Sequence, residues 1–94
     1  MDYELVWPAD FDDYAWEVEC KGWFPGLGIV IEGEVIQLTI YDPVRLGQDI
    51  EMELGLYGSS MFRRVIVVDT VTRENIEKAI AGLAKRGELV SLVE

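Results

Sequence analysis

The stretch that decides the fold is Leu27–Tyr41, with the sequence LGIVIEGEVIQLTIY. Two runs rich in β-branched residues, Leu27–Ile31 and Val35–Tyr41, lie on either side of the pair Glu32-Gly33. Such runs are typical of strands, and a glycine in the short loop supplies the positive φ that a tight hairpin needs. We therefore predict a β-hairpin whose alternate side chains face a common core.

Further strands are predicted on both sides of this hairpin. The segments Tyr14–Lys21 and Ile50–Tyr57 alternate apolar and polar residues, which is typical of half-buried strands. Arg64–Asp69 is predicted as a strand whose run Val65–Val68 is apolar on both faces, as in strands in the middle of a sheet. Pro43 ends the second hairpin strand because proline cannot donate to the ladder. Glu88–Val93 is predicted as a short terminal strand.

A single helix is predicted after these strands. Thr72 is a good N-cap, Gly87 is placed to end the helix, and Glu74 and Lys78 have the i,i+4 spacing of a favourable ion pair. Its apolar residues recur at i, i+3, i+4 and i+7: Ile76, Ala79, Ile80 and Leu83. We predict one α+β domain over residues 1–94. It contains a mostly antiparallel sheet of about five strands with one amphipathic helix packed on one face.

Charge excludes some classes of function. The 94 residues include 8 basic and 18 acidic side chains and no histidine, a net charge of −10. Residues 1–60 hold thirteen acidic and two basic residues, so the acidic excess lies there. Nucleic-acid binding is not expected, because phosphate contacts need clustered lysine and arginine. A disordered acidic tail is also not expected, because 50% of the residues are hydrophobic.

Cysteine content and hydropathy bear on the compartment. The one cysteine, Cys20, cannot form an intramolecular disulfide, which favours the cytoplasm. The first residues lack the basic and apolar regions of a signal peptide. The apolar runs are far shorter than the ~20 residues that span a bilayer. We therefore expect a cytoplasmic protein that does not enter the membrane.

The residue types in this sequence do not favour catalysis or metal binding. Without histidine, the commonest general base is missing. Asp10–Asp13 lacks the third ligand and the glycine of a calcium loop, and one cysteine cannot make a zinc site. Glu51 and Glu53 are spaced as a carboxylate pair, but a chain this short leaves little room for a sugar cleft. We expect no catalytic residues, no metal and no cofactor, and an enzyme is the least favoured hypothesis.

The segment Trp7–Trp16 mixes four aromatic residues with three aspartates. Aromatic residues are enriched at binding hot spots, and carboxylates steer basic partners toward a surface. Alternatively, the aromatic side chains cover the edge of a small core and the aspartates form its solvated rim. Further acidic and aromatic residues fall on the sheet face that the predicted helix leaves uncovered. The candidate partner-binding residues are Asp10, Asp12, Asp13, Tyr14, Glu17, Glu19, Tyr41, Glu51, Glu53 and Tyr57.

The leading hypothesis is a non-enzymatic acidic module that binds a basic protein partner. In size, acidity and sheet-plus-helix layout, the chain resembles the small acidic immunity proteins that bacteria pair with toxins. That resemblance implies a tight one-to-one complex with a basic toxin, and it transfers no individual residue. The alternative is a homodimeric structural or regulatory subunit that associates through an open sheet edge or the Trp23–Pro25 loop.

Overall fold

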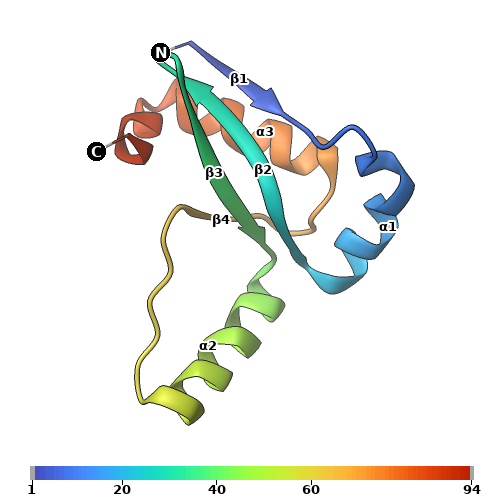
Figure 1. Ribbon diagram of the computed structural model, residues 1–94, viewed down its shortest axis with the longest axis vertical. Coiled ribbons are helices and arrows are strands. Elements are labelled where there is room, and N and C mark those ends of the chain that lie inside the picture. The colour runs from blue at the N-terminus through green and yellow to red at the C-terminus, as the bar shows by residue number, and fades with distance from the viewer. Residues whose placement is uncertain (1, 94) are drawn as a thin grey trace.

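The computed structural model describes residues 2–93 and confirms an α+β fold (Figure 1). The element order is β1 (Tyr3–Val6), α1 (Phe11–Lys21), β2 (Trp23–Ile31), β3 (Glu34–Tyr41), α2 (Pro43–Tyr57), β4 (Val65–Val67), α3 (Arg73–Lys85) and the 3-10 helix η1 (Glu88–Leu92). The radius of gyration is 13.8 Å, whereas about 12 Å is typical of a domain of this length. The molecule is elongated because α2 projects away from the sheet (Figure 1).

The sheet has four strands in the order β1-β2-β3-β4. β2 pairs with β1 and with β3 in antiparallel fashion, whereas β3 and β4 are parallel. The predicted hairpin is confirmed. Its turn residues Glu32 and Gly33 have φ values of 53° and 80°, which fits the positive φ at both central positions of a type I′ turn.

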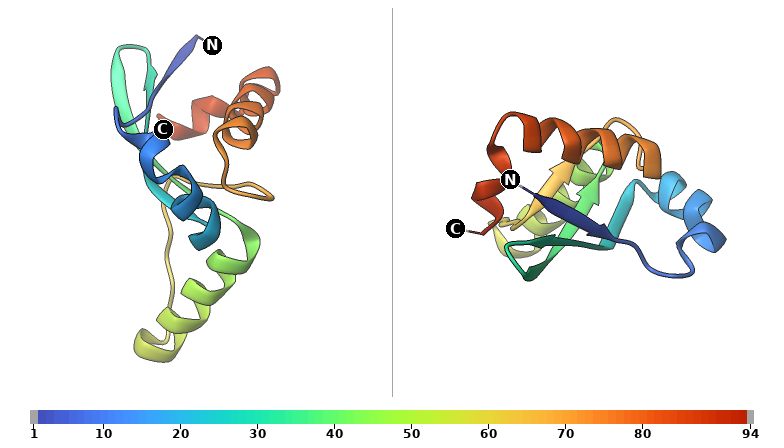
Figure 2. Two further views of the ribbon diagram at one scale, coloured as in Figure 1. Left: turned by 90° about the vertical axis from the view of Figure 1, so that its right-hand side faces the viewer. Right: turned by 90° about the horizontal axis from the view of Figure 1, so that it is seen from above.

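The core lies between one face of the sheet and α3 (Figure 2). Its fully buried residues include Leu27, Ile29, Ile31, Leu38, Ile40, Ile76 and Ile80. The prediction of α3 is confirmed in its details: the Thr72 side chain accepts a hydrogen bond from the Asn75 amide at 3.2 Å, and Glu74 and Lys78 pair at 3.0 Å. One amphipathic helix therefore covers one sheet face, as expected.

The strand prediction for Tyr14–Lys21 is wrong, because this segment belongs to α1. Helix α1 is kinked at Tyr14, whose φ of −128° and ψ of 17° are not helical, and Phe11 and Val18 on either side of the kink are both buried. The alternation that follows Tyr14 does not match the burial, since Val18 is buried whereas Trp16 and Cys20, on the same predicted strand face, are exposed. Gly22 ends α1 in the left-handed conformation, with φ 67°.

The strand prediction for Ile50–Tyr57 is also wrong, because α2 continues through it to Tyr57. The Asp42 side chain accepts a hydrogen bond from the Arg45 amide at 2.7 Å, and Pro43 occupies the first turn. An aspartate N-cap followed by proline is a helix start, so Asp42-Pro43 both ends β3 and begins α2. The chain therefore has three α-helices in its described part instead of one.

The remaining differences concern the last part of the chain. The strand predicted within Arg64–Asp69 is confirmed as β4, but its predicted central position is wrong, because β4 lies at the sheet edge and pairs in parallel. Ile66 and Val68 face the core, whereas Val67 is 46% exposed because no helix covers that side. Glu88–Val93 forms a 3-10 helix and not a strand, and Leu89 anchors it in the core. The sheet has four strands of mixed direction in place of about five antiparallel ones.

Candidate protein-binding surfaces

The most unusual feature of the molecule is that none of the fifteen residues of α2 is buried. Met52, Leu54, Leu56 and Tyr57 have exposed fractions of 57%, 49%, 66% and 72%. A helix of about this length is only marginally stable in water on its own, and packing of an apolar face normally stabilises it. Helix α2 therefore exposes apolar side chains on more than one side, and residues 2–93 do not cover them.

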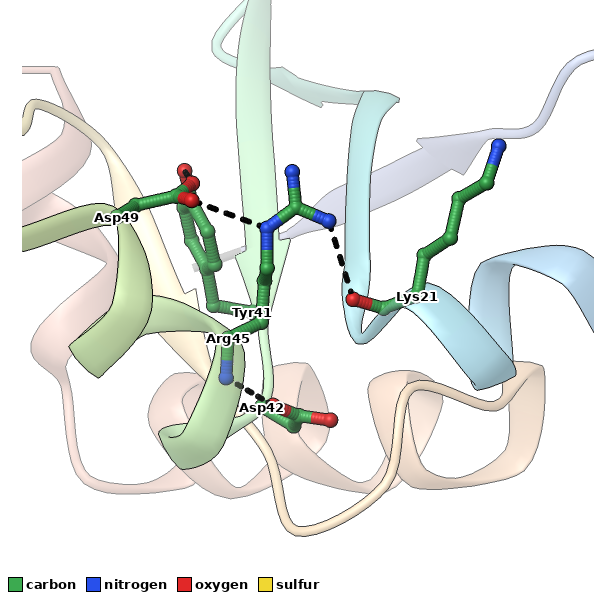
Figure 3. Close-up of polar contacts among 5 residues, drawn as sticks. All are labelled: Lys21, Tyr41, Asp42, Arg45 and Asp49. Atoms are coloured by element: carbon green, nitrogen blue, oxygen red, sulfur yellow. Dashed lines mark hydrogen bonds and ion pairs between the residues drawn. The ribbon is translucent and has the colours of Figure 1, made fainter. Parts of the chain in front are cut away.

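Polar contacts fix the base of α2 to the sheet and to α1 (Figure 3). The Tyr41 hydroxyl donates a hydrogen bond to Asp49 Oδ2 at 2.6 Å, and Arg45 Nε donates to Asp49 Oδ1 at 3.0 Å. Arg45 Nη1 also donates to the Lys21 carbonyl at 3.3 Å, and its guanidinium lies 5.1 Å from the centre of the Trp23 ring. The first turns of α2 are thus held, while its second half extends outward.

The hydrogen bond between Tyr41 and Asp49 shifts the pKa of both side chains. Burial, followed by the hydrogen bond to Asp49, raises the pKa of Tyr41 to about 12. The same hydrogen bond is the main cause that lowers the pKa of Asp49 below its ordinary value. Near neutral pH the phenol is therefore neutral and the carboxylate is charged, which is the pair of states that the hydrogen bond needs.

A second uncovered surface is the sheet face opposite α3, which we call the outer sheet face. It carries the side chains that alternate with the core positions: Glu4, Val6, Val30, Val35, Gln37, Thr39, Val65 and Val67. Val6, Val35 and Val67 are 45%, 62% and 46% exposed. In a parallel βαβ unit the connecting helix ordinarily packs on the sheet. Helix α2 connects β3 to β4, but its first turns cover this face only at one end, where Tyr41 is buried and bonds to Asp49, and the rest of the face stays open (Figure 2).

A third surface is the solvent side of α1, which we call the acidic surface. Its carboxylates are Asp10, Asp12, Asp13, Glu17 and Glu19, all of them on exposed residues. Two of them contact cations: Asp12 pairs with Arg73 at 3.3 Å and Glu17 with Lys21 at 3.9 Å. The Trp16 side chain is 67% exposed in their midst. This combination of an aromatic ring and a carboxylate surplus is suited to a basic protein surface.

The other aromatic residues of Trp7–Trp16 have a structural explanation. Phe11 is buried, and its ring centre lies 4.8 Å from that of Trp7, 5.0 Å from Phe24 and 5.7 Å from Tyr14. The guanidinium of Arg73 lies 4.8 Å from the centre of the Trp7 ring. These rings cover the edge of the core, whereas Trp16 is left free for contacts.

The candidate residues that were predicted on one sheet face do not gather there, because all of them except Tyr41 lie on helices: Glu17, Glu19, Tyr41, Glu51, Glu53 and Tyr57. Asp10, Asp12, Asp13, Tyr14, Glu17 and Glu19 lie on or directly before α1, whereas Glu51, Glu53 and Tyr57 lie on α2. Tyr41 is 5% exposed and cannot reach a partner. The sequence analysis missed the apolar residues of α2, because the strand interpretation placed Met52, Leu54 and Leu56 on a buried face. The helix start at Asp42-Pro43 is the signal that reveals them.

The described residues give few other clues to function. A hollow of about 280 Å³ lies between α1 and β2, lined by Tyr14, Glu17, Val18, Lys21, Trp23, Phe24, Pro25 and Gly26. Within residues 2–93, no group of three acidic or cysteine side chains could hold a metal ion, and none of the helices is long and apolar enough to cross a membrane. In comparisons with known proteins, no family model, curated protein or solved structure matched this chain.

Proposed function

We propose that this protein is a non-enzymatic protein-binding module whose main docking element is α2. The observation that carries this proposal is that all residues of α2 lie outside the core although several are large and apolar. Burying such a side chain stabilises a complex by about 1.5–3 kcal/mol. Met52 and Leu56 form one exposed apolar pair on α2, and Leu54 and Tyr57 form a second on another side of the helix. Exposed apolar groups of this kind are typical of interaction sites.

The titratable groups support a binding role more than a catalytic one. Among the described residues, the pKa shifts fall on Tyr14, Tyr41 and Asp49. Tyr41 and Asp49 bond to each other at the base of α2, and the Tyr14 ring packs edge-on against Phe11. Each shift therefore has a cause within the fold, and none marks an acid and a base that face an open cleft.

A second candidate function is the binding of a basic protein partner at the acidic surface, such as a toxin neutralised by an immunity protein. The exposed indole of Trp16 among the carboxylates of α1 favours it. Carboxylates at such a surface raise the association rate with a basic partner, and the effect weakens with salt. This function is compatible with docking through α2, since the two helices present separate surfaces.

Site-specific photo-crosslinking in the source cells tests the role of α2. With benzoylphenylalanine in place of Leu56, we expect a protein adduct, and none with the same group in place of Glu77, an exposed residue of α3. Adding Leu54→Asp to the first chain should remove the adduct. If position 56 gives no adduct, or if the adduct persists with Leu54→Asp, α2 is not the docking element.

Charge reversal tests the acidic surface. Replacing Asp10, Asp12 and Asp13 by lysine should slow association with basic nucleases purified from the same source. The matched control replaces three exposed glutamates at the other end of the sheet, Glu4, Glu32 and Glu34, and makes the same change in net charge. Equal effects of the two triple variants would show that only the total charge matters. No binding by the unmodified chain at low salt would remove this second function.

A further inference from the structure

We propose that the occupant of α2 is a second copy of this chain, and that α2 of each protomer lies on the outer sheet face of the other. This inference rests on the proposed function and names the partner. The two uncovered apolar surfaces of the molecule are a projecting helix and an open sheet face. In a two-fold symmetric dimer, α2 of each protomer contacts the outer sheet face of its partner, and these two equivalent contacts cover both surfaces of both protomers.

Topology is the first argument for a second copy. β3 and β4 are parallel neighbours, and the helix between them would ordinarily cover the sheet to which they belong. Here α2 extends away from that sheet, and Val35 and Val67 of the outer sheet face remain open. An element that leaves its place in its own chain and fills the same place in another is the arrangement of a domain-swapped dimer. A second copy supplies both missing surfaces without any other protein.

The exposed area is the second argument. An α-helix turns by about 100° per residue, so Leu54 points away from Met52 and Leu56, and α2 can lay only one apolar pair on a sheet, Met52 with Leu56 or Leu54 with Tyr57. That pair, Met61 and the three exposed valines of the outer sheet face make six side chains of 45–79% exposure. Full burial of a whole side chain removes roughly 60–120 Å² from water, so their exposed parts offer roughly 320 Å². If apolar atoms make about 65% of a homodimer interface, this corresponds to roughly 500 Å² per protomer. A total of about 1,000 Å² is the lower limit for a specific interface, so we expect a weak dimer.

Charge is the third argument, because two copies of net charge −10 would repel each other if the acid were evenly spread. Residues 1–41 hold nine acidic residues and one basic residue, whereas residues 42–68 hold four acidic and three basic ones. The outer sheet face adds one charged residue, Glu4, so this face and residues 42–68 together hold five acidic and three basic residues, and most of the acidic excess lies elsewhere. In the described part of the chain, Glu51 and Glu53 form no salt bridge, and neither do Arg63 and Arg64. Glutamates of one copy can thus pair with arginines of the other.

Mass measurement over a concentration series tests the dimer. We expect the purified chain to dimerise, and two double variants to weaken dimerisation at least about 100-fold: Leu54→Asp with Leu56→Asp on α2, and Val35→Asp with Val67→Asp on the outer sheet face. Val90→Asp, a change at a 41% exposed residue on η1, is the matched control and should dimerise like the unmodified chain. Circular dichroism should show that every variant keeps its fold, since the changed residues lie outside the core.

Mixing the two double variants gives the decisive result. One carries an intact sheet face and the other an intact α2, so the mixture restores one of the two contacts, and heterodimers should form where neither variant self-associates. If the outer-face variant dimerises by itself as well as the unmodified chain does, α2 does not bind this face. A chain that stays monomeric at every concentration overturns the inference. If position 56 then crosslinks to a different protein in cells, the proposed function still stands.

Discussion

Replacing Tyr41 by phenylalanine is expected to destabilise the protein by about 2 kcal/mol, because it removes the hydrogen bond that ties the base of α2 to the sheet. The bond is 2.6 Å long and its acceptor is a charged carboxylate, while the Tyr41 residue is only 5% exposed. Hydrogen bonds to charged groups contribute about 1.5–3 kcal/mol. Asp49 keeps its contact with Arg45, so the loss falls within that range and not above it. In a domain of this size the melting temperature should fall by about 8–16 °C.

The pH dependence of this loss has a definite sign. The pKa of Asp49 is lowered by folding, so its stabilising contribution is present above its ordinary pKa and is lost as pH falls through its folded value. The pKa of Tyr41 is raised to about 12, so its contribution is present below about pH 10 and is lost as pH rises from about 10 to about 12. The difference in the free energy of unfolding between the unmodified protein and the Tyr41→Phe variant should therefore be constant from about pH 5 to about pH 9 and become smaller below and above that range.

Urea denaturation at one fixed protein concentration measures these differences, since dimerisation makes the midpoint depend on concentration. A double-mutant cycle with Asp49→Asn isolates the contact, and the coupling energy should account for most of the loss from Tyr41→Phe. A loss below about 0.5 kcal/mol, typical of changes at a surface site, would refute this explanation of how α2 is attached. So would a difference between the two proteins that grows above pH 10.

Four further substitutions should have contrasting effects on the free energy of unfolding. Gly22→Ala should lower the free energy of unfolding more than Gly33→Ala, although both glycines have positive φ. A Cβ at Gly22 would collide with the Asp42 carboxylate that caps α2, whereas Gly33 has open space around it. Urea titration of the two variants compares the losses. Ile80→Ala should cost about 2–5 kcal/mol, because Ile80 lies fully buried between α3 and the sheet, and a smaller loss in thermal unfolding would contradict the packing described. Cys20→Ser should change stability by less than about 0.5 kcal/mol, and the native thiol should react at once with a thiol reagent, since Cys20 is exposed.

The parts of the fold that the sequence predicts correctly are those in which local signals and burial agree. The hairpin has β-branched strands around Glu32-Gly33, and α3 has a cap, an ion pair and one apolar stripe that meets the sheet. Helix α2 fails this test because its apolar residues are exposed and do not follow the core of its own chain. Ile50 and Leu54 are four residues apart, a spacing that fits a strand face and a helix face equally well.

The sequence predicts which residue types form the candidate site better than it predicts which elements carry them. The carboxylates of Asp10–Glu19 are exposed in the structure, but they lie on α1 and not on a strand. The exposure of Trp16 could not be distinguished from the burial of Phe11 by residue type alone, because both depend on which side of α1 meets the core. An interpretation of Asp42-Pro43 as a helix start would have revealed the α2 surface.

The connection from β3 to β4 is much longer than the sheet requires. β4 has three residues, so a return of about 10 Å along the strand would complete the parallel pair. Residues 43–64, which include α2 and the extended segment after it, make a far larger excursion. No residue of α2 belongs to the core, and the polar contacts that hold its base end at Asp49. We therefore expect residues 50–61 to accept insertions, deletions and substitutions while the rest of the fold is kept. Under the proposed function, this segment is where binding specificity would change in evolution or by engineering.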